Sequence, residues 1–182
     1  MNIYIPTNFI NIYTTLYQGT QINDIILKYV PKSSIISDFT GGIGGNSFMF
    51  CRDFKYVNVI EKEYDLNVII KNNLKDFNNK TIYIGNFNIF KNILKQDVIF
   101  IDPPWGGSDY KYKNNIDLYI DNVNILDIID SLYNYTYIVC LKIPNNFNFK
   151  SIQKLFWNFK TYAIYKNKSK LKSVYKIIIF SK

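Results

Sequence analysis

The chain has 182 residues, of which 48% are hydrophobic and 18% aromatic, so it can bury the core of one domain and is too apolar to be disordered. It contains no histidine, which excludes Ser-His-Asp catalysis, Cys-His catalysis and His-ligated zinc, and we expect no metal site. No apolar run approaches the roughly 20 residues of a membrane helix. The first residues also lack the basic start and long apolar core of a signal peptide. We therefore expect an intracellular protein that does not contact a membrane, with Cys51 and Cys140 as reduced core residues.

The net charge of +8 is unevenly distributed along the chain. Residues 131–182 contain ten lysines and no Asp or Glu, so this segment carries +10 and residues 1–130 carry −2. Such asymmetry is typical of proteins that bind a polyanion, and nucleic acid is the first candidate inside a cell. A lysine-rich solvated face produced by A/T-rich codons, which also favour Asn, Ile, Tyr and Phe, is an equal alternative on charge alone.

Helices and strands alternate in the predicted elements. The first is a helical segment over residues 8–30, with Ile22, Ile25 and Ile26 at helical spacing, Thr20 as its N-cap and Pro31 as its end. After it we predict strands over residues 34–39, 56–60, 81–84, 97–101, 135–143, 161–166 and 173–181, and helices over 46–54, 64–77, 121–132 and 147–159.

This alternation predicts an α/β fold of the Rossmann-like type, with a mostly parallel seven-stranded sheet and helices on both faces. We expect a single domain over residues 1–182, in which residues 1–30 form a helical N-terminal extension that contributes to the site and residues 31–182 form the core. Ligands of such sheets bind beyond the carboxyl ends of the strands. Three motifs of this chain fall at such ends.

The first two motifs indicate a nucleoside cofactor. The strand that ends at Asp38 is followed by a glycine loop that includes Gly42 and Gly44, where backbone can approach a ligand closely. A serine stands where the dinucleotide fingerprint requires Gly or Ala, which favours a cofactor without a pyrophosphate. Glu61 ends the next strand, where a carboxylate can accept hydrogen bonds from both ribose hydroxyls. Asn86 follows the third strand and could face the adenine, with a simple turn as the alternative.

The third motif is Asp-Pro-Pro-Trp-Gly-Gly at residues 102–107. Two prolines stiffen the backbone after a buried strand and two glycines then free it. Rigid carbonyls beside the Asp102 carboxylate form an acceptor pocket that suits an –NH2 group, and Trp105 offers a flat face for a base. For a cationic base, cation–π attraction would add roughly 0.5–2 kcal/mol. The alternative, a structural turn with a core tryptophan, explains this order of residues poorly.

Residues 38–46 and 102–110, in this order, resemble the trimethylguanosine synthase family. Members are class I methyltransferases that use S-adenosylmethionine to methylate the 2-amino group of 7-methylguanosine in RNA caps. The resemblance covers about residues 15–150. It implies a capped RNA as partner, S-adenosylmethionine as cofactor and S-adenosylhomocysteine as product.

Site residues also follow from this resemblance. The catalytic set would be Asp102, Pro103 and Trp105, with Pro103 orienting the amine and Trp105 stacking the methylated guanine. The cofactor set would be Thr20, Asp38, Gly42, Gly44, Asn46, Glu61, Asn86 and Asp102. The substrate set would be Trp105, Tyr110, Lys142 and Asn145, with Tyr110 reaching the cap phosphates.

Two positions depart from the family pattern. The family usually has Ser where Asp102 stands, and Asp is the residue favoured by enzymes that methylate the exocyclic amine of adenine. A basic residue is usual where Asn145 stands, so we expect phosphate binding to pass to Lys142 or Lys150. The first alternative function is therefore an adenine-amine methyltransferase acting on DNA or RNA.

The second alternative is a non-catalytic module that binds caps or RNA through Trp105 and the lysine face. The intact glycine loop with Glu61 disfavours it, because a pure binder need not retain a cofactor site. We expect a monomer located in the nucleus or the cytoplasm. The small size and codon bias would also suit a minimal viral enzyme in the host cytoplasm.

Overall fold

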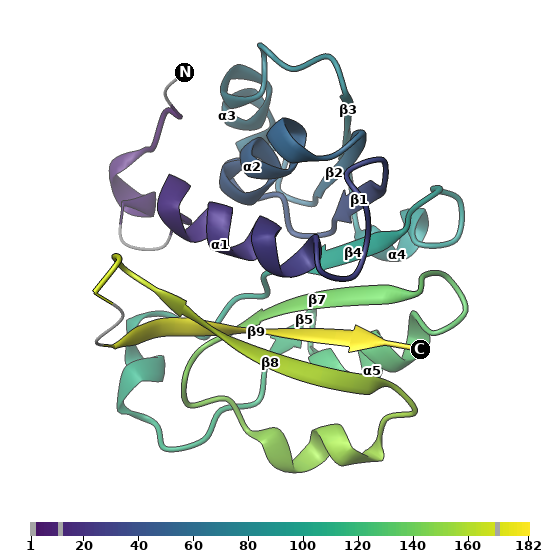
Figure 1. The fold of residues 1–182 in the computed structure, drawn as a ribbon. Helices are drawn as coiled ribbons and strands as arrows, with labels where there is room; N and C mark the ends of the chain where they lie inside the picture. The colour runs from purple at the N-terminus through teal and green to yellow at the C-terminus, as the bar shows by residue number, and fades with distance from the viewer. Residues whose placement is uncertain (1–2, 11–12, 170–171) are drawn as a thin grey trace.

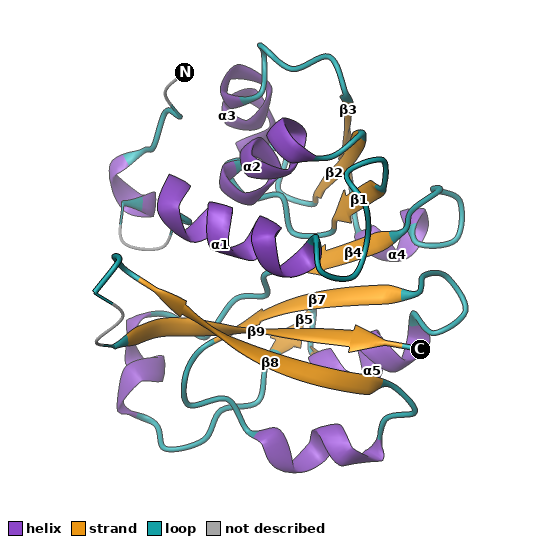
Figure 2. Cartoon of the chain, in the orientation of Figure 1, coloured by secondary structure: helices purple, strands orange, loops and turns teal. Residues whose placement is uncertain are grey.

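The computed structural model describes residues 3–10, 13–169 and 172–182 of the chain. A seven-stranded sheet runs through the molecule (Figures 1 and 2). Its strands are β1 (Ile35–Asp38), β2 (Tyr56–Glu61), β3 (Lys80–Ile84), β4 (Val98–Ile101), β7 (Ile138–Ile143), β8 (Asn158–Tyr165) and β9 (Ser173–Ser181).

The strand order is β3-β2-β1-β4-β7-β9-β8. The five strands from β3 to β7 are parallel, whereas β9 runs antiparallel to both β7 and β8. The chain builds outward from β1 through β2 to β3 and then returns to place β4 on the other side of β1. The order of the strands therefore reverses between β1 and β4, and ligands bind at such a reversal in open α/β sheets.

Helices cover both faces of the sheet, as expected. Their bounds are α1 (Leu16–Ile26), α2 (Gly45–Asp53), α3 (Leu66–Asn73), α4 (Phe87–Phe90) and α5 (Ile125–Ser131), with short 3-10 turns η1 (Thr7–Phe9), η2 (Ser108–Tyr112) and η3 (Phe149–Lys154). The first three α-helices share one buried cluster with alternate residues of the strands, and α4, α5 and η3 share the other. Because successive strand residues point to opposite faces, the central strands are apolar on both sides.

Several predicted element boundaries were wrong. Helix α1 is shorter than the segment predicted over residues 8–30, and its N-cap is Thr15 rather than Thr20: Thr15 and Gln18 form a reciprocal capping box. Within the predicted segment, residues 11–12 lie outside the described residues. The helix predicted over residues 64–77 is shorter, and the one over 147–159 is reduced to η3, because β8 already begins at Asn158.

A small hairpin replaces the start of the helix predicted over residues 121–132. Strands β5 (Tyr119–Ile120) and β6 (Val123–Asn124) pair antiparallel through Asp121 and Asn122, whose φ angles are +50° and +64°. Positive φ at both turn residues is what a two-residue type I′ hairpin requires. Helix α5 then starts only at Ile125, capped by the Asn124 side chain.

In the described part of the chain, no helix combines the length and the apolar character needed to cross a bilayer. Both cysteines are buried and unpaired, as predicted: Cys51 lies in α2 and Cys140 in β7.

Candidate functional site

The site lies where β1, β2 and β4 end beside the strand-order reversal. A cavity of about 290 Å³ opens there. Its lining residues are Phe39, Thr40, Gly42, Glu61, Lys62, Gly85, Asn86, Phe87, Asp102, Pro104, Ile120 and Asp121. The three motifs singled out in the sequence therefore meet around one space, whose size is close to the lower end of the roughly 300–1,000 Å³ typical of small-molecule sites.

A larger depression of about 560 Å³ lies elsewhere, along Leu16 of α1, Phe48 and Arg52 of α2, and Phe77. It contains none of the motif residues and lies away from the carboxyl ends of the parallel strands. We assign the functional site to the smaller cavity, because residues of all three motifs line it beside the strand-order reversal.

The glycine loop and Glu61 form one unit. Gly42 and Gly44 have φ angles of +53° and +86°, which L side chains rarely adopt. The backbone N–H of Gly42 donates to Glu61 Oε2 at 2.7 Å, and that of Glu63 donates to Oε1 at 2.8 Å. Each carboxylate oxygen keeps a lone pair for another donor. Glu61 is thus held at the cavity wall with acceptor capacity on both oxygens.

Asp38 lies beneath the loop and is fully buried. Its carboxylate accepts the Ser47 hydroxyl at 2.6 Å and the backbone N–H of Thr40 at 3.2 Å. Burial raises the pKa of Asp38 to about 7, with smaller upward contributions from the charges of Asp102 and Glu61, against the two hydrogen bonds, which lower it. A cation bound beside Asp38 would favour its ionised form.

Asn46, the second residue of α2, offers an unused buried acceptor. Its Nδ2 donates weakly to Asp102 Oδ2 at 3.4 Å, while its buried Oδ1 has no hydrogen-bond partner in the structure. Buried polar groups are nearly always paired, so such an orphan calls for an explanation. A bound donor such as an ammonium group would supply one.

The far end of the cavity is apolar and closed by the β5–β6 hairpin. Phe39 and Phe87 stack with ring centroids 5.2 Å apart. Asn86 caps α4 and donates to Asp121 Oδ2 at 2.8 Å, and Lys62 pairs with Oδ1 of the same carboxylate at 2.5 Å. The hydrogen bond to Asp121 raises the pKa of Lys62. The hairpin is therefore tied to the ends of β2 and β3 at this end of the cavity.

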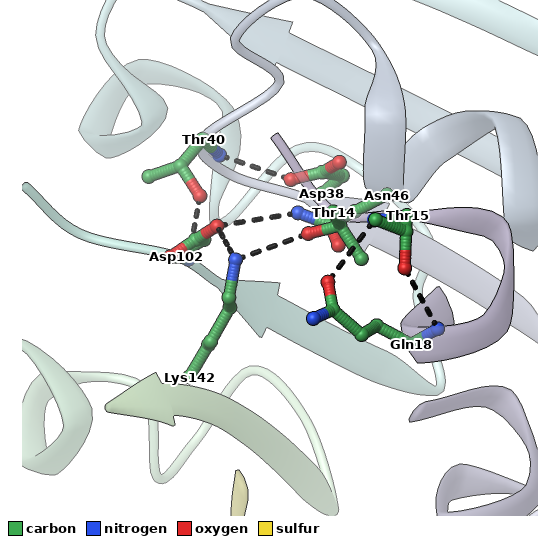
Figure 3. Close-up of polar contacts among 8 residues, drawn as sticks. All are labelled: Thr14, Thr15, Gln18, Asp38, Thr40, Asn46, Asp102 and Lys142. Atoms are coloured by element: carbon green, nitrogen blue, oxygen red, sulfur yellow. Dashed lines mark hydrogen bonds and ion pairs between the residues drawn. The ribbon is translucent and has the colours of Figure 1, made fainter. Parts of the chain in front are cut away.

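The loop that follows β4 is organised around Asp102 (Figure 3). Its Oδ2 receives Lys142 Nζ at 2.7 Å, and the same ammonium donates to Thr14 Oγ1 at 3.0 Å. The backbone N–H of Asp102 donates to Thr40 Oγ1 at 2.7 Å, which fixes the loop onto the end of β1. Lys142 is only 3% exposed, so this is a largely buried ion pair rather than a surface one.

Trp105 is half-buried among aromatic rings and a cation. It meets Tyr110 and Tyr175 edge-on, with 5.2 Å and 6.0 Å between ring centroids. Lys142 Nζ lies 5.6 Å from the ring centroid of Trp105. Pro103 beside it is buried, whereas Pro104 lines the cavity. The indole is therefore fixed at the edge of the site by its neighbours.

Three predicted site residues have other surroundings than expected. Thr20 is exposed on α1 and donates to the Leu16 carbonyl one turn earlier, so it does not line the cavity. Lys142, predicted with Lys150 as an alternative ligand for phosphates, is buried against Asp102, so its ammonium is already paired and shielded from solvent. Asn145 exchanges hydrogen bonds with Ser173 and holds the start of β9.

Of the other predicted residues, Gly42, Glu61, Asn86 and Asp102 line the cavity. Tyr110 is half-buried beside Trp105, and burial raises its pKa. Its carbonyl accepts Asn146 Nδ2 at 2.7 Å, which ties the loop after Trp105 to the end of β7. Lys150 is exposed at η3 and therefore open to a phosphate.

A model of the family described as RNA cap guanine-N2 methyltransferase matches residues 33–178. The chain belongs to this family. The match spans the strands from β1 to most of β9 and includes the glycine loop, Glu61 and the Asp-Pro-Pro-Trp loop.

The chain is similar to one curated protein in sequence and to solved structures in fold. It is 37% identical over 142 residues to uncharacterized protein L320 of Acanthamoeba polyphaga mimivirus, which covers 74% of this chain and 54% of that protein. The chain thus spans about half the length of this curated relative. Protein PH1948 of Pyrococcus horikoshii superposes with a TM-score of 0.60 at 16% identity, over 100% of this chain and 92% of that one. M. jannaschii TYW2 in complex with AdoMet gives 0.56 at 11% identity, over 94% and 78%. At these identities the two structures support the fold alone.

Sequence reasoning missed four contributors to the site: Thr14, Thr40, Asp121 and Tyr175. Thr40 stands within the glycine motif and could have been noticed as a hydroxyl at the strand end. Asp121-Asn122 is a tolerable pair for a positive-φ turn, but the apolar spacing that follows favoured a helix. Thr14 and Tyr175 carry no local signal, because their roles arise only from the folded arrangement.

Proposed function

We propose that this protein uses S-adenosylmethionine to methylate the exocyclic 2-amino group of 7-methylguanosine in an RNA cap. The observation that carries the proposal is the Asp-Pro-Pro-Trp loop, which the sheet places beside a nucleoside-sized cavity at the strand-order reversal. Membership in the cap guanine-N2 family supports the choice of acceptor.

The residues present fit such a cofactor. Glu61 offers acceptors for two ribose hydroxyls, and the apolar end formed by Phe39, Phe87 and Ile120 suits a flat base. The orphaned Oδ1 of Asn46 and the buried Asp38 suit the ammonium of the amino-acid part. When bound, the cofactor supplies an activated methyl group on a sulfonium.

The protein's own task is to place the acceptor amine in line with that methyl group, about 3–3.5 Å away. We assign the base to the Trp105 face and the amine to the backbone carbonyls of the loop and the Asp102 carboxylate. An acceptor-only carboxylate receives an N–H and so directs the nitrogen lone pair away from itself. The bound cofactor would supply the methyl group to this lone pair and keep the C–S electron pair on sulfur, and Asp102 or water would accept the proton that the amine loses.

The decisive test is methyl transfer from labelled S-adenosylmethionine to 7-methyl-GDP, GDP and an adenine-containing oligonucleotide. Transfer to 7-methyl-GDP alone is the expected result, because the charge at position 7 acidifies the exocyclic amine and strengthens stacking on Trp105. Transfer to GDP and 7-methyl-GDP alike would show that the methyl group at position 7 is not recognised.

A second candidate, an adenine-amine methyltransferase, is favoured by the carboxylate at position 102. Transfer to the oligonucleotide alone would establish it in place of the cap activity. A third outcome, binding of S-adenosylhomocysteine without transfer to any acceptor, would contradict both acceptors. Lack of cofactor binding as well would point to the non-catalytic RNA-binding module.

A further inference from the structure

Lys142 occupies an unusual position for a lysine. It lies near the carboxyl end of β7, an interior strand of the sheet, and is 3% exposed, whereas lysine is almost never buried unless it is paired. Its ammonium contacts Asp102 Oδ2 at 2.7 Å and Thr14 Oγ1 at 3.0 Å, and it lies 4.6 Å from the ring centroid of Tyr175. All of these contacts come from segments far apart in the chain, so the fold has built an enclosure around this cation.

This enclosure determines how Asp102 is oriented. The hydrogen bonds recorded for its side chain, from Lys142 and from Asn46 Nδ2, both go to Oδ2. Among the described residues none reaches Oδ1. With the backbone of Asp102 held by Thr40, the carboxylate cannot turn without breaking the ion pair. Oδ1 is therefore the oxygen left for an incoming donor.

The same pair also sets the local charge. Lys142 Nζ lies 5.6 Å from the centroid of Trp105, the ring to which we assign the acceptor base. At this range a unit charge in a partly buried site changes the binding of a cationic base relative to a neutral one by roughly tenfold or more. With Asp102 ionised beside it, the two charges cancel.

We propose that Lys142 is a positioning residue that fixes Asp102 with Oδ1 toward the acceptor amine and holds the net charge beside Trp105 at zero. The inference rests on the proposed methylation function. In this arrangement Asp102 still accepts a hydrogen bond from the amine. Its negative charge is balanced by Lys142, so the pocket does not attract a cationic base as an unpaired carboxylate would.

Four proteins form a charge series that tests this proposal. The wild type and the double variant Asp102→Ser/Lys142→Met carry zero net charge beside Trp105, Lys142→Met carries −1 and Asp102→Ser carries +1. The measurement is the ratio of the GDP and 7-methyl-GDP dissociation constants, by calorimetry in saturating S-adenosylhomocysteine. We expect the ratio to rise roughly tenfold in Lys142→Met, to fall roughly tenfold in Asp102→Ser and to stay within about threefold of wild type in the double variant.

Turnover supplies the second measurement. Lys142→Met should lower kcat for 7-methyl-GDP by roughly 100-fold with a smaller change in KM, because a mobile carboxylate no longer aims the amine although the base still stacks. Lys160→Met is the matched control: Lys160 is exposed on β8, so the same loss of charge should leave the ratio and kcat unchanged.

Folding is monitored by circular dichroism and by the thermal unfolding transition. Removal of one partner leaves a buried charge unpaired, which is destabilising, whereas the double variant has no such charge. If Lys142→Met does not fold, the double variant and Asp102→Ser still differ by one charge, and the ratio must differ between them by roughly tenfold.

A flat ratio across the folded proteins would overturn the proposal, as would an unchanged kcat in Lys142→Met. If the wild type binds both nucleotides but methylates neither, the proposed function fails, while the binding ratios still decide the role of Lys142.

Discussion

The cofactor side and the acceptor side of the site are built in different ways. On the cofactor side the contacts are short in sequence: Ser47 bonds Asp38 nine residues away, and Gly42 bonds Glu61 nineteen residues away. On the acceptor side, Lys142 bonds Asp102 at a separation of 40 residues and Thr14 at 128. The first side is thus specified by one βαβ unit, and the second exists only when distant segments have come together. Variants on the two sides should therefore affect different measurements.

The largest expected effect concerns Asp38. Because the folded-state pKa is about 7 against an ordinary 3.8, the folded protein retains a proton between pH 4 and pH 7 that the unfolded chain releases. The free energy of unfolding should therefore fall as pH rises through this window and level off above pH 7, by up to about 4 kcal/mol from this group.

Urea unfolding of wild type and Asp38→Asn between pH 4 and pH 8 checks this expectation. The variant should lose most of the slope, whereas Asp130→Asn, at an exposed position, should retain it. An equal slope in wild type and Asp38→Asn would show that Asp38 is not the group that titrates.

The next largest effect is expected for Trp105 on the acceptor side. Trp105→Ala should weaken 7-methyl-GDP binding by roughly 10–100-fold, since stacking of a base on an aromatic ring contributes about 1–3 kcal/mol. The affinity for S-adenosylhomocysteine should stay within about threefold. Trp105→Phe keeps an aromatic face and should recover part of the loss. Parallel losses of both ligands in Trp105→Ala would mean that the two sides are not separable.

The corresponding variant on the cofactor side is Glu61→Gln. In Glu61→Gln one of the two oxygens becomes an amide donor and faces a backbone N–H of Gly42 or Glu63. S-adenosylhomocysteine should bind roughly tenfold more weakly, since a lost hydrogen bond to a charged group contributes about 1.5–3 kcal/mol. The side chain of Glu63 is exposed, so Glu63→Gln removes the same charge as a control. Equal affinities in the two variants would contradict the role of Glu61.

The smallest effect is expected for two neighbouring glycines, Gly44 and Gly45. Gly44 has a φ of +86°, where a Cβ costs roughly 1–2 kcal/mol, whereas Gly45 begins α2 and its added Cβ would meet only ordinary contacts at 3.8 Å. Gly44→Ala should lower the cofactor affinity about fivefold and Gly45→Ala less. A larger loss in Gly45→Ala would place the ligand against α2 rather than against the loop.

The same contrast explains what could be predicted from the sequence. The strand ends at Asp38 and Glu61, the glycine loop and the seven-stranded sheet follow from local patterns, and the structure confirms them. The burial of Lys142 could not be predicted, because lysine is usually solvated and its partners lie far away in the sequence. The β5–β6 hairpin was missed because the apolar spacing after Asp121 fits a helix as well as a turn.

The contact between Thr14 and Lys142 also bears on the order in which the protein matures. Synthesis proceeds from the N-terminus, so the glycine loop leaves the ribosome first. Glu61 follows it, about 80 residues before Lys142. Closure of a long loop is slow, because its entropy must be lost before the contact is gained. A nascent chain stopped before β7 would carry the residues of the cofactor side but leave Asp102 without its partner. The ability to orient an acceptor base would then be the last property that the growing chain acquires.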